Sequence, residues 1–191
     1  MLSYIFAIRG FFLPLEGLLL AFFIGALLAY FSNRSLKTLY RIPYLFMFSL
    51  IFLVYIFMSY TVNVALLNIN GTVAPTVIRL IAAIPPFLFG YAAMYLSVLR
   101  ARDGFANKFS AWLLIVPLFN LGLFIVTLDD DPNDNEKAIQ RDPLSTPRFM
   151  NGAAGVIVAT IIFALSFTFG MMSVTYPTVD VVLQTVDLPL D

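Results

Sequence analysis

The hydrophobic positions of this chain gather into five long runs that shorter polar segments separate. The runs occupy about residues 11–31, 43–67, 75–99, 110–128 and 149–172. An α-helix rises about 1.5 Å per residue, so about 20 apolar residues cross a hydrocarbon core of roughly 30 Å. The pattern therefore predicts an all-α fold: a polytopic transmembrane helical bundle with five spans, in a single membrane domain over residues 1–191.

Small residues recur at every fourth position of the first run. These positions are Gly17, Ala21, Gly25 and Ala29. Residues four apart lie on the same side of a helix, and small side chains there let a second backbone come close. The start of the fifth run has a similar face, formed by Gly152, Gly155 and Ala159. We expect both faces to pack against helices, either within the bundle or in another subunit.

Positive charges in the short connecting segments set the expected orientation. The segments after the first and third runs carry the bases Arg34, Lys37, Arg41, Arg100, Arg102 and Lys108. Lys and Arg concentrate in the cytoplasmic loops of membrane proteins. We therefore place both segments in the cytoplasm and the N-terminus outside.

The fourth run, 110–128, is open to two arrangements. Its length, about 28 Å as a helix, favours a fifth crossing. However, Pro117 and Gly122 interrupt it. If this segment is re-entrant, the bases of residues 129–148 also come to the cytoplasmic side, which the charge rule favours. Five spans are the working prediction, and four spans plus a re-entrant fourth segment are its alternative.

Residues 129–148 form an extended polar segment. Its leading acids are Asp129, Asp130, Asp131, Asp134 and Glu136. A calcium loop of the EF-hand kind needs alternating ligands, a central Gly and a Glu at its twelfth position, which this segment lacks. We therefore predict a solvated or partner-docking loop and no metal site. The tail, residues 176–191, loosely alternates apolar and polar positions and predicts an extended arm.

Two charged residues stand inside apolar runs, Glu16 in the first and Arg79 in the third. With the N-terminus outside, both lie at a similar depth below the outer surface, and so does Asn63 of the second run. A lone charge at that depth costs roughly 1–3 kcal/mol, and pairing offsets the cost. We predict an ion pair between Glu16 and Arg79 that Asn63 completes. It acts as a structural clamp, with a substrate or proton site as the alternative.

The composition narrows the chemistry. The chain is 61% hydrophobic and 12% charged, and it contains no Cys and no His. The commonest metal ligand, the usual haem ligand and the usual acid–base residue are therefore absent. We therefore expect that the protein is not an enzyme and has no catalytic residue. The aromatic side chains of the second run suit lipid contact, and the alternative is a bound quinone or carotenoid; no cofactor is required.

Residues 100–143 carry several short motifs in a fixed order. Arg100 and Arg102 precede Asp103, Ser110-Ala111-Trp112 opens the fourth run, Pro117 interrupts it, and Asn135-Glu136 and Asp142-Pro143 close the polar segment. In this order the segment resembles a domain-of-unknown-function family (family 805) of small bacterial inner-membrane proteins. Ala101-Arg102 stands where that family has Leu-His, and its Gly-rich signature is absent. The resemblance implies an inner-membrane protein and no chemistry.

These features predict a non-catalytic accessory or scaffolding subunit of a larger membrane complex of the respiratory, photosynthetic, secretion or transport kind. Packing faces, a docking loop and an arm all suit contacts between proteins. A small transporter or channel for a solute or ion is the alternative, although such proteins usually carry several intramembrane charges and an internal repeat. The expected partners are the lipid bilayer and other integral membrane subunits, with no nucleic acid, in a bacterial inner membrane.

Overall fold

The computed structural model describes residues 15–34, 37–69, 73–105, 107–115, 123, 144–150 and 152–186. Within these ranges the secondary structure is helical. The elements in chain order are α2 (Leu15–Ser32), α3 (Arg41–Ile69), α4 (Pro75–Phe105), η1 (Lys108–Ile115), η2 (Arg148–Met150) and α6 (Gly152–Val186). Both η elements are short 3-10 helices. The predicted all-α class is therefore confirmed for the described part of the chain.

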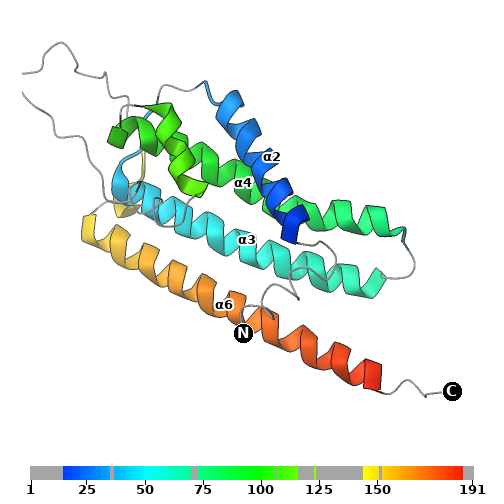
Figure 1. The fold of residues 1–191 in the computed structure, drawn as a ribbon. Helices are drawn as coiled ribbons and strands as arrows, with labels where there is room; N and C mark the ends of the chain where they lie inside the picture. Colours follow the sequence, from blue (N-terminus) through cyan, green and yellow to red (C-terminus); the bar gives the residue numbers. More distant parts are fainter. Residues whose placement is uncertain are drawn as a thin grey trace, which may run out of the picture.

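The four α-helices are ordered α2, α4, α3 and α6 across the bundle, because each packs against the next (Figure 1). α3 and α4 run antiparallel, as the short connection between them requires. α6 runs along α3 in the same direction: Phe46 contacts Phe149 near the start of both, and Tyr60 contacts Phe169 further along. α2 and α4 run in the opposite direction and cross each other.

Consequently α2 and α4 end where α3 and α6 begin (Figure 1). We call this the basic end of the bundle, because the described cations in and beside these helix ends are Arg34, Lys37, Arg41, Arg100, Arg102, Lys108 and Arg148. Since α4 ends here and α6 begins here, residues 106–151 leave and return at the same end.

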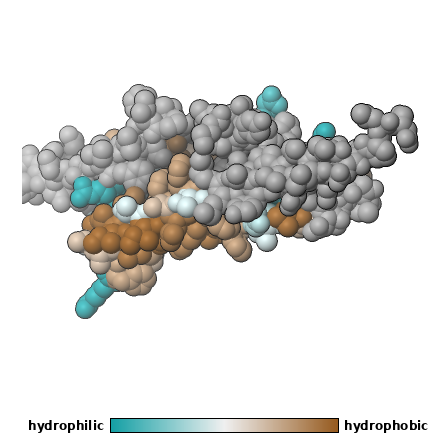
Figure 2. All heavy atoms as spheres, turned by 90° about the horizontal axis from the view of Figure 1, so that it is seen from below, coloured by the Kyte–Doolittle hydropathy of each residue, from teal (hydrophilic) through white to brown (hydrophobic). Residues whose placement is uncertain are grey.

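In the part of the chain that the structure describes, three helices are long and apolar enough to cross a membrane: Arg41–Leu66, Thr76–Phe105 and Gly152–Gly170. α2 is shorter, with an apolar stretch of Glu16–Ser32. The lengths and apolar composition of these helices mark the chain as a membrane protein. Its outer faces also carry large apolar side chains. Figure 2 shows such side chains gathered over the described part of the face seen from below. The five predicted spans are not confirmed, since the first residues of the fourth run, 110–115, lie in the 3-10 helix η1, which packs against α4.

α6 continues to Val186, so the extended arm predicted from residue 176 is wrong as far as that residue. Alternation was a weak signal there, and a helix that is already formed grows more readily than a new one starts, so that α6 continues even past Pro177. The helix gives every added N–H a partner four residues back, which an isolated arm in solvent could find only in water.

At the crossing of α2 over α4 the two backbones touch at a glycine of each helix, Gly25 and Gly90. A Cβ built on Gly25 would overlap the carbonyl of Phe87, and one built on Gly90 would overlap the carbonyl of Phe22. The ring of Phe89, beside Gly90, contacts Phe22 and stacks on Tyr55 with ring centres 4.6 Å apart. The glycines thus let the helices touch, and an aromatic cluster fills the space beside the crossing.

Candidate functional site, a buried polar cluster at the basic end

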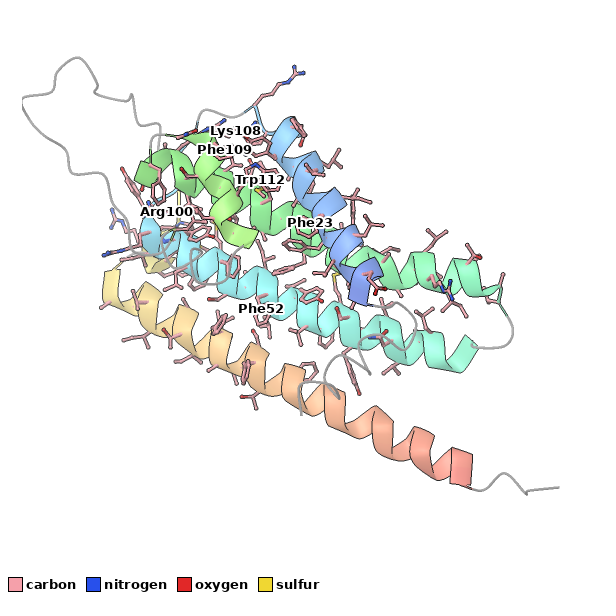
Figure 3. All side chains as sticks on the ribbon, in the orientation of Figure 1. Phe23, Phe52, Arg100, Lys108, Phe109 and Trp112 are labelled. Carbon is pink, nitrogen blue, oxygen red and sulfur yellow. The ribbon has the colours of Figure 1, made fainter. Side chains whose placement is uncertain are left out.

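The most deeply buried charge in the described part of the chain is Arg100, whose side chain is 0% exposed. It lies near the end of α4, beside the first turns of α3 (Figure 3). Its Nη1 donates to the carboxylate of Asp103, one turn further along, and its Nε donates to the carbonyl oxygen of Leu123 at 2.7 Å. The guanidinium therefore joins α4 to the segment that follows η1.

A second buried contact joins α3 to α4 one turn before Arg100. The hydroxyls of Tyr44 and Ser97 lie 3.1 Å apart, and both side chains are fully buried. Ser97 Oγ also donates to the carbonyl of Ala93 at 2.8 Å. Polar groups away from water are stable only when they are paired in this way, so the contact fixes how α3 sits on α4.

The loop between α2 and α3 is tied to the same place through its backbone. The N–H of Leu39 donates to the carbonyl of Leu99 at 3.1 Å, and the N–H of Leu144 donates to the carbonyl of Thr38 at 2.9 Å. Together with the bond from Arg100 to Leu123, these bonds bring three separate segments of the chain to the end of α4.

The short helix η1 covers the end of α2. Trp112 packs on Tyr30 with ring centres 5.2 Å apart, and the ammonium of Lys108 lies 4.3 Å from the centre of the same ring. Figure 3 shows both side chains of η1 beside the end of α2. A cation over an aromatic face is attracted by the electron density of the ring. Trp112 and Lys108 of η1 therefore anchor the end of α2 through Tyr30.

The chemistry of this cluster is that of a structural joint. Arg100 and Asp103 neutralise each other, and the guanidinium donates a further hydrogen bond to a backbone carbonyl. Within the described ranges, no group of His, Cys, Asp or Glu is arranged to hold a metal ion. The cluster was missed in the sequence, although opposite charges three residues apart at the end of an apolar helix are a recognisable signal.

The predicted clamp has a different outcome. Glu16 and Arg79 lie near the N-terminal ends of α2 and α4, away from the basic end of the bundle, and both are exposed. No described side chain forms an ion pair with either of them. Asn63, half-buried on α3, lines a small cavity instead. The Glu16–Arg79 pair stays a prediction.

The predicted packing faces divide between used and unused positions. Ala21, Gly25 and Ala29 are buried against α4, and Gly17 is half-buried. On α6, Gly155 and Ala159 are buried; a Cβ on Gly155 would meet the carbonyl of Met150 and the side chain of Ile42. Gly152 is exposed and has a positive φ of 72°, so it serves the chain entry into α6 and not packing.

The acidic loop residues Asp129, Asp130, Asp131, Asp134 and Glu136 lie outside the described residues. The aromatic side chains of α3 pack largely on protein: Phe52 stacks on Phe163 of α6 and contacts Phe89 of α4.

Comparison of the chain with protein-family models, with curated proteins and with solved structures finds no match. The resemblance of residues 100–143 to a family therefore stays a prediction as well.

Proposed function

We propose that the protein is a non-catalytic subunit that packs within a larger membrane assembly, in a bacterial inner membrane. The observation that carries this proposal is the arrangement of small residues on α6. One side of the helix, with Gly155, Ala159 and Ser166, is buried on α3. The opposite side carries Thr160, Ala164 and Thr168, which are exposed.

At 100° per residue, Ala164 lies almost diametrically opposite the side of α6 that contacts α3. Lipid chains select for large apolar side chains, whereas small residues four apart let another helix approach closely. In the described part of the chain, α6 packs against α3 and η2 and not against α2 or α4. A second helix, supplied by another subunit, fits this free side.

The proposed topology has four crossings and a re-entrant fourth segment. Leu123 contacts Arg100, about one and a half turns before the end of α4, although an unbroken helix from residue 110 would by then have risen about 20 Å. Leu144 is also bound at the basic end, through Thr38. With the basic end in the cytoplasm, the bundle obeys the positive-inside rule. The N-terminal end of α2 and the C-terminal end of α6 then lie outside.

Photo-cross-linking in native membranes tests the subunit proposal. The chain has no Cys, so an introduced Cys is the sole thiol and can carry a benzophenone maleimide. Ala164→Cys places the probe on the free small-residue side, and Leu165→Cys, its exposed neighbour, places it a quarter-turn away. We expect a discrete protein adduct from position 164 and lipid adducts alone from position 165.

Purification in mild detergent gives an independent test. Large partner proteins that co-purify in a fixed ratio support the accessory role. Lipid adducts from both positions, together with a single monodisperse species whose melting temperature shifts with a solute, contradict it. That result favours the transporter alternative.

A further inference from the structure

The structure contains a small cavity between α2, α3 and α4, towards the end of the bundle away from the basic end. Ser59 and Asn63 line it from α3, Ala82, Pro85 and Pro86 line it from α4, and Leu18 closes it from α2. Its volume is about 20 Å³. A cavity of this size holds about one water molecule, provided that polar partners are present.

The backbone of α4 supplies one such partner. In an α-helix, the carbonyl of residue i accepts from the N–H of residue i+4, or of residue i+3 in a tighter turn. For Ala82 these positions are Pro86 and Pro85, and neither proline has an N–H. α4 nevertheless continues unbroken from Pro75 to Phe105. The oxygen of Ala82 points along the helix towards Pro86, beside the cavity.

The facing side of α3 supplies two more. Hydroxyls in these helices usually donate to the carbonyl four residues earlier, as Ser49 and Thr61 do. Ser59 and the amide of Asn63 form no hydrogen bond with the described part of the chain. In an apolar medium an amide without a partner is costly. Three polar groups that lack a hydrogen-bond partner in the described part of the chain therefore surround a space about the size of one water molecule.

We infer that this cavity binds a single water molecule that joins Ser59 and Asn63 to the carbonyl of Ala82. A water molecule donates two hydrogen bonds and accepts two, which matches one carbonyl acceptor, one hydroxyl and one amide. A bare cation is the poorer fit, because none of the groups that line the cavity carries a negative charge. The water takes the place of the N–H that Pro86 lacks, and so stabilises the proline pair within α4.

A double-mutant cycle tests whether Asn63 serves the carbonyl of Ala82. Pro86→Ala restores an N–H that can bond to this carbonyl, so the water becomes less important. Asn63→Leu removes the amide at nearly constant volume. We expect Asn63→Leu to lower the melting temperature by about 2–4 °C in the native protein, and by less than half as much in the Pro86→Ala background. Thr61→Val, on the exposed side of α3, should show no such coupling.

Solid-state NMR on the native protein in lipid bilayers observes the water directly. Magnetisation should transfer from water to the side-chain NH₂ of Asn63, and not to the backbone amide of Ala93, which is fully buried. A lack of transfer to Asn63 would overturn the inference, since the amide then bonds directly to protein or faces a lipid chain. Equal destabilisation by Asn63→Leu in both backgrounds would overturn it too, because the bound water would not serve Ala82. The NMR measurement needs no variant, so it decides the question even if a substitution prevents folding.

Discussion

At the scale of single residues, the polar groups of this protein work as connections between segments. Arg100 spends its donors on Asp103 and on the backbone of Leu123, and Tyr44 meets Ser97 across two helices. Buried charges are costly to transfer from water, so such a pair persists only when its geometry satisfies both partners. The described interactions of Arg100 meet that condition with protein groups alone.

The charge pair can be tested by removing one partner and then both. Arg100→Met leaves the carboxylate of Asp103 buried without its cation, so we expect a loss of about 3–5 kcal/mol in the free energy of unfolding. The double change with Asp103→Leu should cost clearly less than the sum of the two single changes. Arg34→Met, at an exposed position of the same end, is the control and should change little. Additive effects in detergent unfolding would show that the pair contributes no coupling.

The outcome for single residues shows which sequence signals carry information. Glu16 and Arg79 were selected because a charge within an apolar run is expensive, yet both are exposed near helix ends, where long side chains reach water. Arg100 lies in a segment that was assigned to a loop, because α4 extends to Phe105 and the prediction ended it at residue 99. Charge alone marked the boundary in the sequence, whereas the structure buries the charge inside the helix.

At the scale of elements, the small-residue pattern predicted the packing of α2 and half of that of α6. Gly25 and its small neighbours face α4, as the spacing indicated. The pattern could not say which helix would be the partner, because small residues occur both on α4, where Gly90 and Ala93 are three apart, and on α6. The partner is fixed by shape: two glycines at one crossing allow backbone contact that one glycine alone would not.

Adding a methyl group at this crossing tests its closeness. Gly25→Ala and Gly90→Ala each force a Cβ onto a backbone carbonyl of the other helix, so the helices must separate along the contact. We expect each change to cost about 1–3 kcal/mol in the free energy of unfolding. Leu28→Phe adds more volume on the exposed side of α2 and should be tolerated. Equal stability of all three variants would mean that α2 and α4 are not in backbone contact in the membrane.

At the scale of the whole molecule, the runs of apolar residues predicted the membrane class and the position of α3, α4 and α6. The sequence alone could not settle the number of crossings. Residues 110–128 have the length of a span, but they contain a Pro and a Gly that can interrupt a helix. The contacts that support the proposed four crossings are tertiary: Arg100 binds Leu123, and Thr38 binds Leu144, both at the basic end. Contacts between residues so far apart in the chain leave no local pattern.

The two topologies differ in where residues on either side of the fourth segment lie. With four crossings, Asn107 and Ser145 share the cytoplasmic side, whereas five crossings put Ser145 outside. Each is exposed, and the absence of native Cys makes Asn107→Cys or Ser145→Cys the only thiol. We expect a membrane-impermeant maleimide to label both in inside-out vesicles and neither in intact spheroplasts. Ala74→Cys, exposed between α3 and α4 at the other end, should label in spheroplasts only. Labelling of Ser145→Cys from the outside would reject the re-entrant arrangement, and with it the cytoplasmic position of residues 144–150.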